Sequence, residues 1–330
     1  MTMSNIRVVI TIFVVVAAAS LFGGGEAQLS STFYSTSCPN VTEVVTSILT
    51  PAFQNDVRIG AKIIRMHFHD CMVNGCDGSL LLDDGNGIET EKTTLPNQSI
   101  TGYNVIDDIK AALESVCPGT VSCADILAIG SQIGVELAQG SPTTWTAELG
   151  RRDSTNANRA GTTAIPSPFD DITTQLRKFD DVNLNPTDLV ALSGAHTFGV
   201  ARCGTFVHRL YNFSGTGAPD TNIDPTYLQT LQQTCPNGGN ANAIENLDQD
   251  TPNTFDNRYF TNLQTNKGLL QTDQDLFSTQ GGATAGIVNQ FAASQTAFFN
   301  AFGTSMIKMG AIRPLTGTNG EIRTICGRPN

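Results

Sequence analysis

The sequence predicts a mainly α-helical fold of about ten or more helices, with only short β segments. Apolar residues recur at helical spacing in several segments, clearly so in residues 41–53 and 105–116. Few segments alternate apolar and polar residues with a period of two, so strands should be short and few. The length of 330 residues suffices for one large core or for two lobes.

The remaining helices are expected further along the chain, and Pro186 marks the start of one of them. The segments with helical periodicity are 59–68, 122–138, 171–179, 257–263 and 284–309. Residues 155–168 lack an apolar period and form the expected boundary between two lobes. Residues 219–252 are expected to be rich in loops, because Gly, Asn and Pro are frequent there.

The first 27 residues have the features of a secretory signal peptide. Arg7 supplies a basic start, residues 8–19 an apolar core, and Gly25-Glu26-Ala27 a small-residue cleavage site. A membrane anchor is the alternative, but the apolar run is too short to span a bilayer comfortably. The mature chain should then begin at Gln28, which can cyclise to pyroglutamate (pyrrolidone carboxylic acid).

Charge and cysteine content narrow the class of protein further. The net charge of −11 argues against binding to nucleic acid or to anionic membranes. Eight cysteines behind a signal peptide indicate disulfides in an oxidising compartment, although spacing alone leaves 105 connectivities open. The sequence contains no CxxC pair, so the cysteines give little support to a zinc site. Glycosylation sequons begin at Asn40, Asn97 and Asn212, and the first and last are plausible surface sites.

Two stretches concentrate residues with special chemistry. In residues 65–79, Arg65 and His69 are four residues apart and therefore share one face of a helix, and carboxylates and two cysteines follow them. In residues 188–199, His196 lies at the end of an apolar helical segment. A lone histidine of this kind is more often a core residue bonded to a neighbour than a metal ligand.

Together these two stretches resemble the distal and proximal haem segments of the secretory plant (class III) haem peroxidases. The resemblance runs from about Gln28 to the C-terminus and includes all eight cysteines. It implies one haem peroxidase domain, residues 28–330, whose helices form a distal lobe (about 28–160) and a proximal lobe (about 161–330) that sandwich the haem. The helical prediction is thereby narrowed to the haem-peroxidase fold.

The resemblance also implies roles for individual residues. His196 would bind the iron of one haem b, supported by Asp273. His69 would transfer a proton between the oxygens of hydrogen peroxide, and Arg65 would stabilise the charge that develops as the O–O bond polarises. Asn97, with Glu91 behind it, would orient His69, so the Asn97 sequon should carry no glycan.

The carbonyl of Pro166 would contact aromatic donors, and His67 is interpreted as structural. Leu95, Thr101, Arg202 and Thr205 depart from the horseradish type, which leaves donor preference and haem-propionate contacts open.

Two calcium sites and four disulfides complete what the resemblance implies, because Asp, Ser, Thr and backbone oxygens are the ligands that calcium prefers. The first calcium ion would take Asp70, Val73, Gly75, Asp77 and Ser79. The second would take Thr197, Asp248, Thr251, Thr254 and Asp256. The disulfides would be Cys38–Cys117, Cys71–Cys76, Cys123–Cys326 and Cys203–Cys235.

The implied function is that of a phenolic donor:hydrogen-peroxide oxidoreductase, which reduces hydrogen peroxide to water while oxidising small phenols in one-electron steps. Cell-wall lignification or cross-linking, the oxidative stress response and peroxide removal are its expected settings. We expect a monomer secreted to the cell wall rather than the vacuole, because the chain ends soon after Cys326.

Two other classes of function fit part of the sequence. A metallohydrolase with zinc at His67, His69 and Asp70 would leave Arg65 and His196 without roles. A non-catalytic, disulfide-stapled calcium-binding module would explain the acids and cysteines but no histidine.

Overall fold

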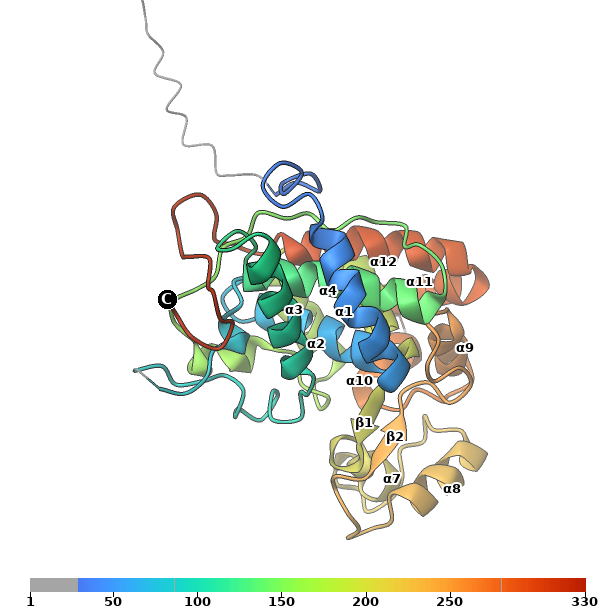
Figure 1. Cartoon of the computed structure of the whole chain (residues 1–330). Helices are drawn as coiled ribbons and strands as arrows, with labels where there is room; N and C mark the ends of the chain where they lie inside the picture. Colours follow the sequence, from blue (N-terminus) through green and yellow to red (C-terminus); the bar gives the residue numbers. More distant parts are fainter. Residues whose placement is uncertain (1–28, 86, 280) are drawn as a thin grey trace, which may run out of the picture.

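A computed structural model describes residues 29–85, 87–279 and 281–330 of the chain, and it is mainly helical as predicted (Figure 1). The expected signal peptide, residues 1–27, and the expected modification at Gln28 lie outside the described residues. Within the described part, none of the helices has the length and apolar character needed to cross a membrane.

Helices and loops make up nearly all of the described chain, and one small antiparallel sheet pairs β1 with β2. The α-helices are α1 (Val41–Asn55), α2 (Ile59–Cys71), α3 (Tyr103–Val116), α4 (Cys123–Gln139), α5 (Ile172–Asp180), α6 (Pro186–Ser193), α7 (Val207–Tyr211), α8 (Pro225–Thr234), α9 (Arg258–Gln264), α10 (Gln271–Ser278), α11 (Ala283–Ala293) and α12 (Gln295–Gly310). The 3-10 helices are η1 (Ser79–Leu81), η2 (Arg159–Ala164), η3 (Gly194–Thr197), η4 (Cys203–Thr205) and η5 (Phe213–Gly215), and the strands are β1 (Val200–Arg202) and β2 (Ile244–Asn246).

Helix α4 is the central support of helix α2, which carries Arg65 and His69. Ser122 caps the start of α4 by accepting a hydrogen bond from the amide of Asp125. Gly60 of α2 faces Gly134 of α4, where a Cβ on Gly60 would lie only 2.6 Å from the Gly134 carbonyl oxygen. Two glycines therefore let the backbones of α2 and α4 cross in direct contact.

The buried apolar residues form three clusters. One lies almost entirely in residues 34–149 and adds Cys326. The largest joins residues of α2 and α4 to helices α6, α9, α11 and α12. The third surrounds α7 and α8, which Figure 1 shows gathered with β1 and β2 at one end of the molecule. Since the largest cluster takes residues from both sides of residues 155–168, the two expected lobes share a core, and their boundary stays a prediction.

Several elements differ from the sequence-based expectations. Helix α1 continues through Pro51 to Asn55. The segment 284–309 is divided at Ser294, which has an extended backbone and caps α12 through the amide of Ala297. The loop-rich segment 219–252 contains α8, whose first turn is capped by Asp224.

Four disulfides join the cysteines in the same pairs that the resemblance implies, and no described cysteine is free. Cys123 at the start of α4 is joined to Cys326, which is 203 residues away in the sequence. This bridge holds the C-terminal segment against the helix that supports α2. Disulfides contribute about 2–4 kcal/mol to stability in typical cases.

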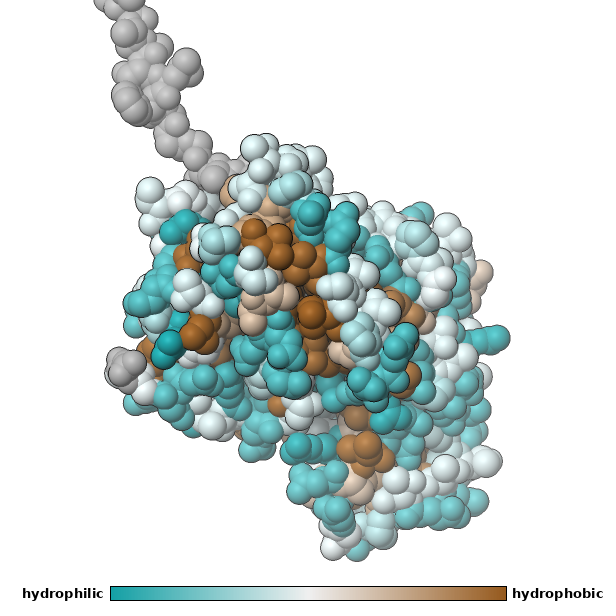
Figure 2. Space-filling view, viewed as in Figure 1, coloured by the Kyte–Doolittle hydropathy of each residue, from teal (hydrophilic) through white to brown (hydrophobic). Residues whose placement is uncertain are grey.

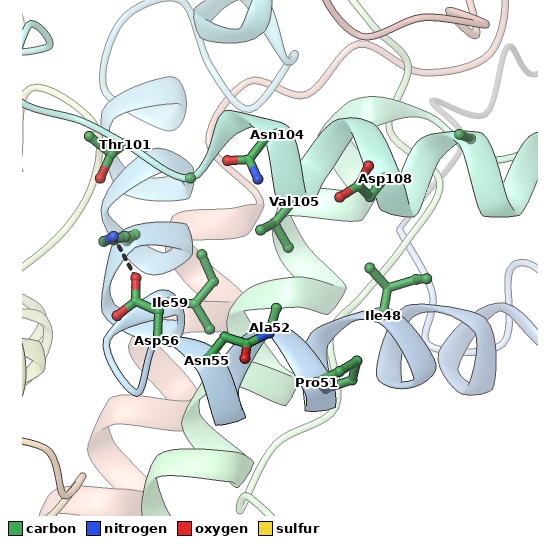
Figure 3. Close-up of a pocket in the computed structure, with 13 residues that line it drawn as sticks. Ile48, Pro51, Ala52, Asn55, Asp56, Ile59, Thr101, Asn104, Val105 and Asp108 are labelled. Carbon is green, nitrogen blue, oxygen red and sulfur yellow. Dashed lines mark hydrogen bonds and ion pairs between the residues drawn. The ribbon is translucent and has the colours of Figure 1, made fainter.

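A groove of about 720 Å³ lies between α1, α3 and the start of α2 (Figure 3). Ile48 and Ala52 of α1 and Val105 of α3 form part of its wall, and an ion pair of 2.6 Å joins Lys62 to Asp56 beside it. None of the expected catalytic or metal-binding residues lines it. The face of the molecule in Figure 2 is mostly hydrophilic, with its apolar residues in a few patches near the centre of the view.

Candidate active site

The distal part of the site is built on one face of helix α2. Arg65 and His69 are one turn apart, and the Arg65 Nε–H donates to His69 Nε2 at 3.4 Å. The Nη2 group of Arg65 also donates to the carbonyl oxygen of Pro96 at 2.9 Å, which fixes the guanidinium in place. The expected pairing of these two side chains is therefore present in the structure.

The loop before α3 holds the other nitrogen of His69. The Nδ1 atom of His69 lies 2.7 Å from Asn97 Oδ1, and the amide nitrogen of Asn97 donates to the backbone carbonyl of Glu91 at 3.0 Å. This chain of bonds places the proton of His69 on Nδ1 and leaves Nε2 without a proton, in agreement with its acceptance of the bond from Arg65. Asn97 is only 1% exposed, so its burial supports the prediction that its sequon carries no glycan.

Glu91 contributes to the distal site through its backbone. Its backbone carbonyl, not its carboxylate, accepts the bond from Asn97. One carboxylate oxygen accepts from the amide of Asn158 at 2.8 Å, and the other is buried without a hydrogen-bond partner. Burial raises the pKa of Glu91 above its usual value. A pattern of residue types does not reveal whether a backbone or side-chain oxygen will be used.

The electrostatics of the distal site keep His69 neutral. Burial and the neighbouring Arg65 charge lower the pKa of His69 to about 3, although the Asn97 bond acts in the opposite direction. Arg65 itself stays cationic, because a guanidinium keeps its proton at any ordinary pH. A neutral imidazole beside a fixed positive charge can accept a proton and stabilise the negative charge that forms.

His67, on the same helix, is fully buried and faces a different environment. Neither ring nitrogen has a hydrogen-bond partner, and burial together with the Arg151 charge lowers its pKa to about 3. Its ligand atoms approach those of Cys71 and Cys76, but these two cysteines are joined to each other. Among the described residues this is the one cluster of possible His, Cys, Asp or Glu metal ligands, and it contains neither His69 nor Asp70, so the structure does not bring the three residues of the zinc alternative together.

The proximal histidine lies on the 3-10 turn η3, directly after α6. Helix α6 begins with a capping box between Asn185 and Asp188. Gly194 then passes so close to the Phe298 ring that a side chain would not fit. His196 lies on this turn, after the last residue of α6, and its ring contacts Asp273 of α10.

His196 is held by a carboxylate. Its Nδ1 atom lies 2.7 Å from Asp273 Oδ1 on α10, so Nδ1 carries the proton that is donated to the carboxylate. The side chain is 38% exposed, and its Nε2 atom has no hydrogen-bond partner among the described residues. Nε2 is thus free to coordinate an iron ion, and the carboxylate makes it a stronger donor.

Tyr259 completes this arrangement and was not identified from the sequence. Its hydroxyl donates to the same Oδ1 atom of Asp273 at 3.0 Å. A tyrosine at a buried helical position is usually a core residue, so spacing carried no signal for this contact.

The first group of expected calcium ligands follows α2. The Asp70 carboxylate is fully buried and accepts from the amides of Gly78 at 2.9 Å and Leu80 at 3.2 Å. Burial raises the pKa of Asp70, and the charge of Asp77 raises it further. The Ser79 hydroxyl is buried without a hydrogen-bond partner. In the described chain, the carbonyl oxygens of residues 73 and 75 accept no hydrogen bond.

The second group converges on Thr197, the residue after His196. Its hydroxyl lies 3.4 Å from Asp248 and 3.2 Å from Asp256. Burial raises the pKa of Asp248, and the Thr251 hydroxyl is buried without a partner. The carbonyl oxygen of Thr254 likewise accepts no bond from the described residues.

The expected donor-binding segment is partly exposed. The Pro166 carbonyl has no hydrogen-bond partner among the described residues, and the side chain of Phe169 nearby is 52% exposed. Leu95, next to the distal loop, is 79% exposed. Thr205 bonds back to Arg202, whose guanidinium donates to Asn242 at 3.2 Å.

Comparison with known proteins identifies the family. The sequence profile of the family described as "Peroxidase" matches residues 45–294. The chain is 58% identical over 330 residues to the lignin-forming anionic peroxidase of Nicotiana tabacum, and the alignment covers 99% of this chain and 100% of that protein. It is 60% identical over 308 residues to peroxidase 15 of Ipomoea batatas, with 92% and 94% of the two chains covered. It is 56% identical over 317 residues to peroxidase 54 of Arabidopsis thaliana, with 96% and 88% covered.

The match to this family profile and these identities place the chain among the haem-dependent oxidoreductases. The chain belongs to the peroxidase family. Within this family it is similar to plant class III peroxidases, which include the three relatives named above. It is therefore an enzyme that reduces peroxide with electrons from a second substrate, and its cofactor is haem.

Proposed function

We propose that this peroxidase binds haem b through His196 and uses hydrogen peroxide to oxidise small phenols in one-electron steps. The observation that carries the proposal is the contrast between the partners of two imidazoles. His196 offers an Nε2 atom without a partner among the described residues, backed by the Asp273 carboxylate, and His69 offers an unprotonated Nε2 atom whose one bond is the long contact of 3.4 Å from Arg65. One arrangement suits an iron ligand, and the other suits a proton acceptor.

The residues of the proximal site fit a haem iron. The side chain of His196 is partly exposed, and its Nδ1–H donates to a buried carboxylate, as metal-binding imidazoles usually require. When bound, the haem supplies the redox chemistry that accepts oxidising equivalents from peroxide and passes them on singly. The chain itself sets the electronic character of the iron ligand through Asp273.

The distal residues would handle the protons. His69 Nε2 takes a proton from the peroxide oxygen nearer to the iron site and returns it to the departing oxygen, so that water leaves. Asn97 keeps the imidazole in the tautomer that this requires. Arg65 stabilises the negative charge on the departing oxygen.

The proposed donors are small aromatic molecules that reach the site at its exposed edge. Pro166 contributes a free carbonyl as an acceptor for a phenol hydroxyl. Leu95 and Phe169 offer exposed apolar surface. They are close in the sequence to Asn97 and Pro166, respectively. The name of the Nicotiana tabacum relative describes that protein as lignin-forming, and we extend lignification or wall cross-linking to this chain as part of the proposal.

We also propose that two calcium ions brace the two histidines. Asp70 follows His69, and Thr197 follows His196, so each ion would fix the end of one histidine-bearing element. The supporting observation is that buried oxygens of Ser79 and Thr251 lack partners beside buried carboxylates. Hard oxygen ligands of this number and type suit calcium.

The setting that we propose is extracellular. A cleaved signal at residues 1–27, a mature start at Gln28, and glycans at Asn40 and Asn212 would fit a monomeric protein of the cell wall. The exposed position of Asn40 and the four disulfides support this setting.

The experiment that tests the proposal uses the mature chain refolded with haem and calcium. We expect a Soret band that shifts on addition of peroxide, and steady turnover with guaiacol or a monolignol. His196→Ala should bind haem more weakly and change the band, whereas the wild type should retain it. A protein that stays colourless with haem, or that turns over no phenol, would overturn the proposal.

Calcium is tested separately by titrating the chelated protein with Ca²⁺ in a calorimeter. We expect two binding events, and Asp77→Asn and Asp256→Asn should each remove one of them. If chelation leaves the melting temperature unchanged and no heat of binding is measured, the calcium sites are wrong while the haem chemistry stands.

A further inference from the structure

The Asp273 carboxylate, which accepts the hydrogen bond from His196, also accepts hydrogen bonds from two other donors. Asp273 Oδ1 lies 2.7 Å from His196 Nδ1 and accepts from the Tyr259 hydroxyl at 3.0 Å. The other oxygen, Oδ2, accepts from the backbone amide of Leu270 at 3.1 Å. Two donors therefore share one oxygen, and the oxygen they share is the one that faces the imidazole.

Packing gives Tyr259 little freedom to release this bond. It is only 1% exposed on helix α9, and its ring meets the His196 ring edge to face, with centroids 6.2 Å apart. The ring of Phe260 packs against it at 5.0 Å. Asp273 is the only partner of the Tyr259 hydroxyl among the described residues. The contact is thus part of the rigid core around the site.

A shared acceptor changes how strongly each donor is bound. A hydrogen bond from Tyr259 withdraws electron density from Oδ1, so this oxygen accepts the Nδ1 proton of His196 less strongly. The proton then stays on the imidazole, and the ring has less anionic character. A less anionic imidazole is a weaker donor to a metal on its other nitrogen, and this strength is one of the means by which a protein tunes haem.

We propose that Tyr259 is a positioning residue that limits the anionic character of His196 through the shared Asp273 oxygen, and so sets the reduction potential of the enzyme. This inference rests on the proposed binding of iron by His196. It assigns Tyr259 no contact with substrate or haem. Its effect is transmitted through one carboxylate oxygen.

The test is Tyr259→Phe in the haem-loaded enzyme, because Phe keeps the ring and its packing and removes one oxygen. We expect the Fe(III)/Fe(II) midpoint potential to fall, since a more anionic ligand favours the ferric form. A hydrogen bond to a charged group is commonly worth about tenfold in an equilibrium constant. For one electron this is a shift of about 59 mV. The iron–histidine stretching frequency of the ferrous enzyme should rise in the Raman spectrum.

Tyr227→Phe is the matched control. The hydroxyl of Tyr227 is also buried, and the charge of Asp273 acts on it, but it has no hydrogen-bond partner. The same substitution there should leave both the potential and the Raman band in place. An equal shift in both variants would overturn the proposal, because it would then follow from lost polarity and not from the shared oxygen.

Two further outcomes are distinguishable. If Tyr259→Phe binds haem normally but its potential and stretching frequency match the wild type, the proposal for Tyr259 is wrong. If the wild type itself shows no iron–histidine band, the proposed role of His196 fails first.

A second experiment covers the case in which Tyr259→Phe does not fold. Incorporation of 3-fluorotyrosine into the Tyr227→Phe enzyme makes the Tyr259 hydroxyl more acidic, and the midpoint potential of the enzyme should then rise. An unchanged potential would also overturn the proposal.

Discussion

The distal and proximal sides of the site use the same side chain with opposite partners. His69 donates to the neutral amide of Asn97 at 2.7 Å, and His196 donates to the carboxylate of Asp273 at the same distance. Beyond the partner, the amide of Asn97 is held by a backbone carbonyl, whereas Asp273 is held by a hydroxyl and a backbone amide. Geometry near the ring is thus almost equal, and charge is what differs.

This difference indicates how one residue type acquires two roles. An amide orients His69 without adding negative charge, so burial and Arg65 keep the pKa of His69 low and the ring neutral. A carboxylate orients His196 and also pushes electron density through the ring toward Nε2. The first ring is suited to exchange a proton quickly, and the second to hold a metal.

The largest expected effect comes from removing the distal imidazole. His69→Ala should slow the reaction with peroxide by about 10²–10⁴-fold, which is the usual contribution of a general acid–base residue. Haem content should not change, because His196 is untouched. Stopped-flow absorbance at several peroxide concentrations measures the rate. A loss of less than about threefold would contradict the assigned role.

A smaller effect is expected when the proximal partner is made to resemble the distal one. Asp273→Asn replaces the carboxylate with an amide, so His196 loses its anionic partner. Loss of such a supporting residue typically costs about 10–100-fold in activity or metal affinity. The midpoint potential should rise, which is opposite to the effect of Tyr259→Phe. An unchanged potential would show that the charge of Asp273 has no influence on the ligand.

Much of this comparison was predictable from the sequence, because it depends on side chains in a short, ordered pattern. The spacing of Arg65 and His69 predicts their common helix face, and both lie on α2 in the structure. Helical periodicity located α1, α3 and α4 to within a few residues. The pairing of cysteines followed from resemblance, since spacing alone leaves it undetermined.

What could not be predicted depends on backbone atoms or on contacts between distant elements. The Glu91 carbonyl and the Tyr259 hydroxyl act at places that no periodicity marks. Helix α8 was missed because Gln and Thr dominate it, although Asp224 before Pro225 is a helix-start signal that was available. The role of Gly60 and Gly134 is visible only in the structure, where they let the backbones of α2 and α4 come into contact.

The reverse exchange sharpens the comparison from the distal side. Asn97→Asp places a carboxylate at His69 Nδ1, and an adjacent negative charge favours the protonated imidazole. The pKa of His69, about 3 in the native protein, should therefore rise. Because the protonated ring cannot accept a proton from peroxide, the acid loss of rate should begin at a higher pH than in the wild type. Rates measured between pH 3 and pH 8 test this, and superimposable profiles would contradict it.

His67 extends the comparison to an imidazole with no hydrogen-bond partner, and the effect expected there is on stability. Burial and the Arg151 charge lower its pKa from 6.5 to about 3, and Glu148 and Arg151 line the small cavity beside it. Between these pH values the unfolded chain takes up a proton on this ring and the folded chain does not. Stability conferred by the neutral ring is thus complete above pH 6.5 and declines as the pH falls toward 3. The slope for one proton is about 1.4 kcal/mol per pH unit.

His67→Phe removes this titration while keeping an aromatic ring at the same buried position. Its free energy of unfolding should depend less steeply on pH than that of the wild type, by about one proton, between pH 4 and pH 6. Denaturant unfolding at several pH values measures both slopes. His69, whose pKa is lowered to about the same value by burial and Arg65, should keep contributing its own proton in both proteins. Parallel stability curves would mean that the His67 ring already carries a proton in the folded protein or gains a partner on protonation. In that case the distinction between a partnered and an unpartnered imidazole would not extend beyond the two histidines of the site.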